Sequence, residues 1–315
     1  MKQLSGNLRY IYSYPYVMSC KQLFKRQMKP FLRILPVLLA FPLVLSLTGC
    51  RDDPSDDPEP TPETGVFELN FRGYWDGAEL FLNKTTEPYT DQVTGNKVII
   101  ENVKFYVSDL RLVKADGTEE QVNDYHLFDF AENHQFVTGS GKTAHAGGEY
   151  MTVEAPLGEY SGVKFGLGVP QDVNNADPSV YGPQHPLSVD QGMHWSWNTG
   201  YIFLKVEGKM DTTPDNGVDD YDLGFAYHTG TNPLYREVDY SGSQQSFFEI
   251  RKDTETQFII DVDLARVFNA GNEAQDVRIP EASISHTTGT EELAQRVTDN
   301  FREAMFYYVN YTPIQ

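Results

Sequence analysis

The sequence predicts an all-β protein: an antiparallel, immunoglobulin-like β-sandwich with one α-helix packed on it at the C-terminus. Two observations carry this prediction. From residue 67 to residue 262, short segments alternate apolar and polar side chains, as strands with one buried face do. One long segment near the end, residues 291–308, instead repeats its apolar residues at helical spacing. Many strands followed by one helix are therefore expected.

The expected strands are separated by turn signals. In the first strand, Phe67, Leu69 and Phe71 alternate with polar residues. Dipeptides such as Asp116-Gly117 mark turns between later strands, because glycine adopts backbone conformations that other residues avoid. The segments expected to form strands are 67–71, 97–100, 104–113, 122–130, 163–169, 201–206, 223–227, 247–251 and 257–262.

The expected C-terminal helix has one apolar face. Thr288 and Glu291 precede that face with the spacing of a capping box. A lone amphipathic helix after many strands is expected to pack on the sandwich and cover one of its edges or ends. A shorter segment, residues 263–269, predicts a single turn of helix. The apolar face of the long helix consists of Leu293, Val297, Phe301, Ala304 and Tyr308.

The N-terminal region, residues 1–49, predicts a secretory signal rather than a retained membrane-spanning helix. Lys29 and Arg33 form a basic region, and the apolar residues 34–47 follow it. The segment ends in Leu-Thr-Gly-Cys, a lipobox pattern, which predicts that Cys50 is lipidated and becomes the first residue of the mature protein. Translation from Met28 gives this signal a normal length, so Met28 is a better start than Met1. A bacterial outer-membrane lipoprotein, anchored in the lipid bilayer through Cys50, is expected.

Residues 50–64 predict a disordered, extended tether between the lipid and the folded domain. Proline and acidic residues dominate the stretch 51–63, and it holds no apolar residue. Acidic residues directly after a lipidated cysteine resemble the surface-export signal of some bacterial lipoproteins. A plain periplasmic linker is an equal alternative, so the protein is expected to be either periplasmic or surface-exposed. Residues 65–315 are expected to form one sandwich domain.

The mature protein is expected to be strongly acidic. Residues 1–49 hold seven basic residues and no acidic one, which leaves 18 basic against 45 acidic residues and a formal charge of −27. Nucleic acids and anionic lipid surfaces require cationic partners, so neither is an expected ligand. Cys20 is removed with the leader and Cys50 carries lipid. A metal site in this domain would therefore have to use histidine, methionine, carboxylate or modified side chains.

A candidate metal site lies around residues 193–201. If the segments 201–208 and 222–227 pair as an antiparallel hairpin, the start of the first strand faces the end of the second. Imidazole and thioether groups gathered there would suit Cu(I). The alternative is an ordinary aromatic strand start packed in a β core, with the histidines exposed or capping strand ends. The candidate ligands are Met193, His194, Trp195, Trp197 and His228, with His286 as a further candidate if the terminal helix folds over the same end.

The expected loop of that hairpin is rich in aspartate. Its five acidic residues are Asp211, Asp215, Asp219, Asp220 and Asp222. Oxygen ligands gathered around a glycine turn can bind Ca²⁺. The spacing does not fit the calcium loop of EF-hands, because Thr213 and Asn216 occupy positions that need other residues. A solvated acidic loop is therefore the simpler alternative to a calcium site.

Four segments in order resemble the MbnP-like family, named after the periplasmic partner protein of methanobactin operons. Their order and spacing match over nearly the whole mature domain. The segments are 103–112 (VKFYVSDLRL), 158–160 (GEY) with 165–170 (FGLGVP), 193–208, which ends in VEG, and 225–230 (FAYHTG).

The resemblance implies a β-sandwich-like fold and a copper function. The family is similar to the copper-binding proteins MopE and CorA of methane-oxidising bacteria, which bind Cu(I) through histidines and a tryptophan oxidised to kynurenine. In the methanobactin system a dihaem enzyme of the cytochrome c peroxidase type performs that oxidation. This sequence departs from the pattern in two places. Trp197 stands two residues after Trp195, where the family places a histidine, and the cysteine that commonly follows the family's HxG segment is absent.

The sequence shows no common enzyme motif: no G-x-S-x-G, no H-E-x-x-H and no glycine–lysine phosphate loop. A non-enzymatic, lipid-anchored extracytoplasmic metal-binding protein that binds or handles Cu(I) is therefore expected. Its partner would be a dihaem peroxidase-like enzyme or a TonB-type receptor. The alternative is a metal-free surface module that binds a glycan or an outer-membrane receptor.

Overall fold

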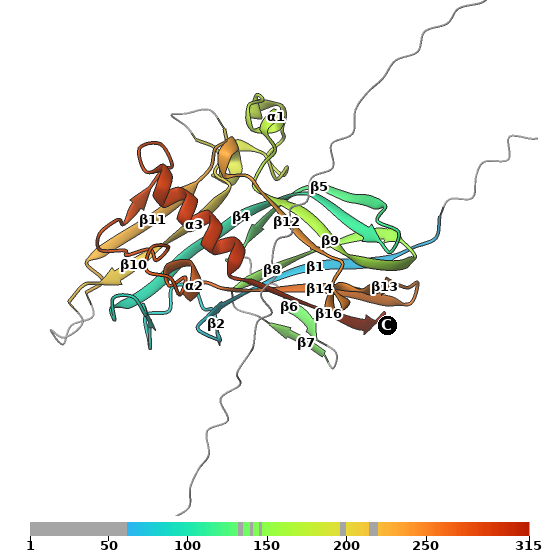
Figure 1. Ribbon diagram of the computed structural model, residues 1–315, viewed down its shortest axis with the longest axis horizontal. Helices are drawn as coiled ribbons and strands as arrows, with labels where there is room; N and C mark the ends of the chain where they lie inside the picture. Colours follow the sequence, from blue (N-terminus) through green and yellow to red (C-terminus); the bar gives the residue numbers. More distant parts are fainter. Residues whose placement is uncertain are drawn as a thin grey trace, which may run out of the picture. The chain divides into compact units, whose positions relative to one another are not determined.

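Two β-sheets face each other and enclose the hydrophobic core, as the all-β prediction requires (Figure 1). The computed structural model describes residues 62–131, 135–138, 141–144, 147–195, 200–213 and 220–314. All of these residues belong to one compact unit, Glu59–Gln315. No helix in this described part of the chain has the length and apolar character needed to cross a membrane.

The first sheet is built around β1 (Thr64–Trp75). One edge of β1 pairs antiparallel with β8 (Gly148–Pro156) and with the short β2 (Ala78–Glu79). Its other edge pairs with β14 (Thr254–Asp263), which in turn pairs antiparallel with β16 (Met305–Pro313). The sandwich is mostly antiparallel, as expected, but the β1–β14 pair is parallel. A parallel pair needs a crossover, and the strands of the second sheet supply it.

The second sheet is built around the long strand β4 (Lys97–Lys114). Its first half pairs with β10 (Leu204–Asp211) and its second half with β9 (Gly158–Leu167), while β5 (Glu119–Asp129) lies along the opposite edge. The two segments 97–100 and 104–113 are therefore one strand. Further members are β3 (Tyr89–Thr90), β11 (Leu223–Thr229), β12 (Arg236–Ser241), β13 (Phe248–Ile250) and β15 (Ile284–Ser285).

Aromatic side chains fill the space between the sheets. The Phe71 ring from β1 meets Phe105 from β4 edge-on, with centroids 4.9 Å apart, and lies 4.6 Å from Phe128 of β5. All three side chains are completely buried. Such edge-to-face packing lets the positive edge of one ring meet the negative face of another. The alternation that predicted the strands therefore also predicted which side chains form this core.

The C-terminal helix α3 (Glu291–Glu303) packs on the sandwich, but it is shorter than expected. Buried Leu293, Val297 and Phe301 form its core face, as predicted. The segment that contains Tyr308 is not helical: it forms β16 and pairs with β14. The run of aromatic and β-branched residues after position 304 favours a strand once an unpaired sheet edge is available. The N-cap residue is Thr290, not Thr288, and its side chain does not cap the helix.

The remaining elements are short. The single turn expected over residues 263–269 is α2 (Ala265–Phe268). Another turn of helix, α1 (Gln171–Asn174), follows β9, and β6 (Gln135–Thr138) pairs with β7 (Gly141–Ala144) apart from both large sheets. Four 3₁₀ turns complete the described part of the chain: Pro178–Val180, Val189–Gln191, Asn232–Leu234 and Gln244–Ser246.

Candidate metal centre

The strands β10 and β11 form the antiparallel hairpin that the sequence predicts. Leu204 lies opposite Thr229 and Lys205 lies opposite His228, so the start of the first strand faces the end of the second. Val206 and Tyr227 point into the core. Because side chains alternate along a strand, Lys205 and His228 share the opposite face of the sheet. Tyr201, which was expected inside the strand, lies before it and forms an isolated bridge with His194.

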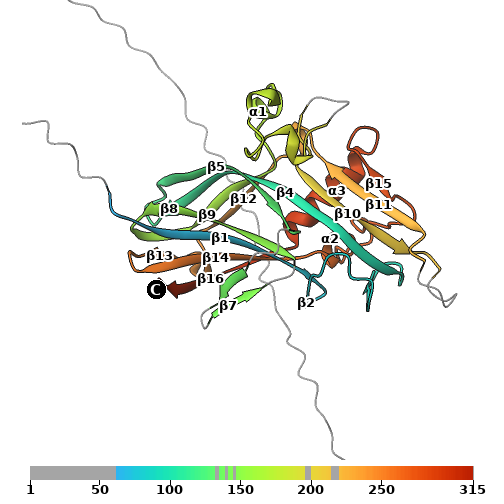
Figure 2. The ribbon, with the colours of Figure 1, turned by 180° about the vertical axis from the view of Figure 1, so that it is seen from behind.

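His286 lies beside His228 because a third strand joins the hairpin. The strand β15 runs parallel to β11, with Tyr227 opposite Ser285 (Figure 2). The next residues of the two segments are His228 and His286, and the centroids of their rings lie 5.1 Å apart. Thr287 holds these two segments together, because its hydroxyl donates to the His228 carbonyl at 3.3 Å and accepts from Gly230 N at 3.0 Å.

Trp195 completes this group of aromatic rings. Its ring centroid lies 6.1 Å from that of His228 and 5.9 Å from that of His286, and the side chain is only 6% exposed. The backbone holds it in place, because Trp195 N donates to Gly200 O at 3.1 Å. Gly200, whose carbonyl accepts this hydrogen bond, has a φ of +101°, a conformation that glycine adopts without steric cost.

Glu207 orients His228. The Nε2 atom of His228 lies 2.6 Å from Glu207 Oε1, and Asn102 Nδ2 donates to the other carboxylate oxygen at 2.9 Å. The hydrogen bond from His228 is the main cause that holds the pKa of Glu207 at about 2, below its usual 4.5. Glu207 is therefore ionised at neutral pH, and its carboxylate fixes the orientation of the His228 ring through Nε2.

Sequence reasoning did not select Glu207, although a signal was present. Glu207 stands two residues after Lys205, so alternation places both side chains on the face that carries His228. Lys205 Nζ donates to Gly192 O at 2.9 Å, which ties the strand to the segment that leads into Met193 and Trp195. Burial lowers the pKa of Lys205.

The other predicted ligands lie differently. Met193 is completely buried in a second apolar cluster with Tyr106 and Tyr201. The His194 ring packs edge-on against Tyr201, with centroids 5.1 Å apart, and burial lowers its pKa. The structure thus brings His228, His286 and Trp195 together and places His194 against a core tyrosine. Trp197 lies outside the described residues.

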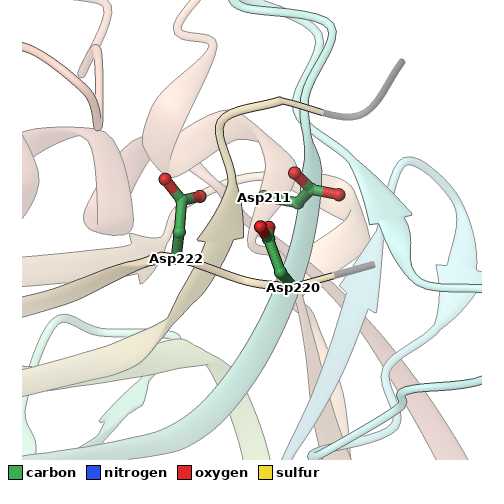
Figure 3. A group of neighbouring side chains, drawn as sticks. All are labelled: Asp211, Asp220 and Asp222. Carbon is green, nitrogen blue, oxygen red and sulfur yellow. The ribbon is translucent and has the colours of Figure 1, made fainter. Parts of the chain in front are cut away.

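Three of the five loop aspartates converge at the opposite end of the hairpin. One carboxylate oxygen from each of Asp211, Asp220 and Asp222 lies within 4.8 Å of the other two (Figure 3). Asp222 accepts hydrogen bonds from Thr212 N and from Thr212 Oγ1, and these bonds lower its pKa. Asp215 and Asp219 lie outside the described residues.

The fold and this group of rings define a β-sandwich protein with a histidine pair at one end of its second sheet. The chain belongs to the MbnP family, because the family model described as MbnP matches residues 64–288. This confirms the family predicted from the four sequence segments. The chain is also similar to the solved structure of MbnP from Methylosinus trichosporium, with 20% identity over 66% of this chain and 78% of that chain and a TM-score of 0.42. Comparison with curated proteins gives no match.

Proposed function

We propose that this protein is a non-enzymatic, lipid-anchored extracytoplasmic metal-binding protein that binds Cu(I) between His228 and His286. The observation that carries this proposal is the pair of imidazole rings 5.1 Å apart beside a nearly buried tryptophan. Fifty-eight positions separate the two histidines in the sequence, so the fold itself builds the pair.

The donor set suits a borderline or soft metal. Neutral imidazoles bind copper well, and Cu(I) accepts a low number of ligands of this kind. Burial is the main cause that lowers the pKa of His286 below its usual value, which favours the neutral ring with a lone pair for a metal. Glu207 fixes the ring orientation of His228 from behind, as carboxylates commonly do for metal-binding histidines.

Trp195, which lies beside both histidines, also fits the proposal. The indole of Trp195 lies beside both imidazoles and forms one wall of the site, while His286 is also exposed to solvent. An intact indole is a poor ligand. We therefore extend the proposal to oxidation of Trp195 to kynurenine, whose aniline nitrogen can coordinate, by a partner dihaem enzyme that supplies the oxidant. The family to which the chain belongs supports this extension.

The location of the protein is part of the same proposal. The lipobox ending at Cys50 supports an outer-membrane lipoprotein, and the acidic stretch that follows supports display away from the bilayer. A TonB-type receptor is the alternative partner to the dihaem enzyme. Both partners concern the handling of metal outside the cytoplasm.

The decisive experiment measures metal content, intact mass and Cu(I) affinity of the full chain purified from its native host. Wild type should bind about one Cu(I), and His228→Ala should weaken binding by a factor of at least about 100, since it removes a ligand that a carboxylate orients. The matched control is His185→Ala, because the His185 ring stacks on Tyr181 instead of on either histidine of the pair. Absence of Cu(I) binding, or equal affinity for both variants, would contradict the proposal and favour a metal-free binding module.

A further inference from the structure

The far end of the β10–β11 hairpin brings acidic side chains face to face. The last described pair of the ladder is Met210 with Leu223, so Asp211 and Asp222 lie across from each other at the next position. Asp220, two residues before Asp222, lies near both of them (Figure 3). Like charges directly opposite one another on paired strands destabilise a hairpin. The arrangement therefore needs a compensating positive charge.

The carboxylate of Asp211 is incompletely satisfied. Asp211 is completely buried, with 0% exposure. One of its carboxylate oxygens, Oδ1, accepts a hydrogen bond from Thr213 N at 2.9 Å. The other oxygen, Oδ2, has no hydrogen-bond donor among the described residues. A buried acceptor without a partner costs about 1–3 kcal/mol, and more when it is charged. Nearby Lys209 is engaged elsewhere, since its Nζ lies 2.7 Å from Glu101.

Hydrogen bonds from Thr212 fix the position of the Asp222 carboxylate. Both of its oxygens accept hydrogen bonds from Thr212, at 2.8 Å from the backbone N and at 2.6 Å from Oγ1. Each carboxylate oxygen has a second lone pair, so these bonds leave acceptor capacity on both atoms. Asp211 at the end of β10 and Asp222 directly before β11 thus present anchored carboxylates, and Asp220 adds a third.

We propose that Asp211, Asp220 and Asp222 bind a Ca²⁺ ion that fastens this end of the hairpin. All three donors are hard anionic oxygens, which Ca²⁺ prefers and Cu(I) does not. Ca²⁺ takes six to eight oxygen ligands in a flexible geometry, so water and carbonyl oxygens complete the shell. Bound Ca²⁺ relieves the repulsion between the strand ends and partners the buried oxygen of Asp211. This site is separate from the histidine pair and does not depend on copper.

The test uses the full chain purified in detergent and freed of metal with a chelator. Calorimetric titration with CaCl₂ should give a dissociation constant on the order of 0.1–1 mM, the range of extracellular calcium modules. At about 10 mM Ca²⁺ the Tm should rise by several degrees, because the ion binds only the folded state. Asp211→Asn and Asp220→Asn should each weaken binding by at least about 10-fold. Asp253→Asn, a substitution in the turn after β13, is the matched control and should behave as wild type.

The variants also test stability without calcium. In chelator, Asp211→Asn should be at least as stable as wild type, because it removes one of three repelling charges. Because Asp220 is exposed, Asp220→Asn should fold and provide the same test even if Asp211→Asn does not fold. His228→Ala should retain the full calcium response, which separates this site from the copper proposal. An unchanged wild-type Tm, equal calcium affinity in all variants, or equal stabilisation by Mg²⁺ would overturn the proposal.

Discussion

His228 and His286 lie side by side because β11 and β15 run parallel in register. Tyr227 faces Ser285 in that ladder, and the next residue of each strand carries an imidazole, with the two ring centroids 5.1 Å apart. In a parallel pair, neighbouring residues of the two strands project to the same face of the sheet. The histidine pair is therefore a direct consequence of strand pairing, and each ring depends on the other strand for its position.

Removal of His286 should weaken Cu(I) binding far more than removal of His194. His286→Ala deletes one ring of the pair, whereas His194→Ala deletes a ring that packs on Tyr201. We expect a loss of affinity of at least about 100-fold for the first variant and less than about threefold for the second. Competition with a chromophoric Cu(I) chelator measures both. Equal losses would show that His194 is the second ligand.

Replacement of Glu207 by glutamine should weaken Cu(I) binding without removing a ligand. The amide keeps the size of the side chain but loses the charge that accepts the Nε2 proton of His228. Loss of such an orienting partner typically costs about 10–100-fold in metal affinity. Glu154→Gln, at an exposed position of β8, provides the control. Wild-type affinity in Glu207→Gln would rule out this orienting role.

The buried carboxyl of Glu68 should make the protein less stable as the pH rises. Burial, followed by interaction with Glu255, raises the pKa of Glu68 from 4.5 to about 8. Below about pH 4.5 the group is protonated in both folded and unfolded chains. Above that pH the unfolded chain releases the proton first, so stability falls until the folded group titrates near pH 8. The loss should be on the order of 2–4 kcal/mol by that pH.

Glu68→Gln should abolish this dependence, because the amide does not titrate and can still accept from Asn70 and Gln257, which hydrogen-bond Glu68 in the wild type. Urea unfolding at about pH 5 and about pH 8.5 measures the difference between the two proteins. The free energy of unfolding of Glu68→Gln, compared with that of wild type, should increase as the pH rises. A difference that is constant across this range would contradict the raised pKa.

Truncation of Phe301 should strongly destabilise the domain. Its ring is completely buried on α3 and meets Phe105 of β4 at 5.1 Å. Phe301→Ala should lower the free energy of unfolding by about 3–5 kcal/mol, since it removes buried area and leaves a cavity. Phe306→Ala is the matched control, because Phe306 is 45% exposed on β16. Similar losses for the two variants would mean that α3 does not close the core.

Substitution of Cys50 should release the protein from the membrane fraction. Lipidation requires the thiol that ends the lipobox, and Cys50 lies outside the described residues. Cys50→Ser should therefore appear in the soluble fraction or remain as an unprocessed precursor. Cys20→Ser should fractionate as wild type, since residue 20 is expected to be removed with the leader or never translated. An unchanged distribution of Cys50→Ser would refute the anchor.

The class of fold, the family and one half of the candidate site could be predicted from the amino-acid sequence. Alternation located most strands of both sheets, because burial of one face imposes a period of two on the side chains, but it missed β8, β12 and β16. It also predicted that β10 pairs with β11, since two strands joined by one loop commonly pair antiparallel, and this placed His228 near the segment that leads into β10. The acidic loop was visible for the same reason, as it connects two neighbouring strands.

The residues that accompany His228 could not be predicted in this way. Alternation leaves the partner of a strand open when that partner is distant in the sequence, so the parallel pairing of β15 could not be predicted and His286 remained one candidate among several. The end of α3 was undecided for a related reason. Residues 305–313 form a strand because β14 offers an unpaired edge, and that edge exists only once the first sheet has assembled. Local patterns fix which side of an element is buried, whereas long-range pairing fixes what it is buried against.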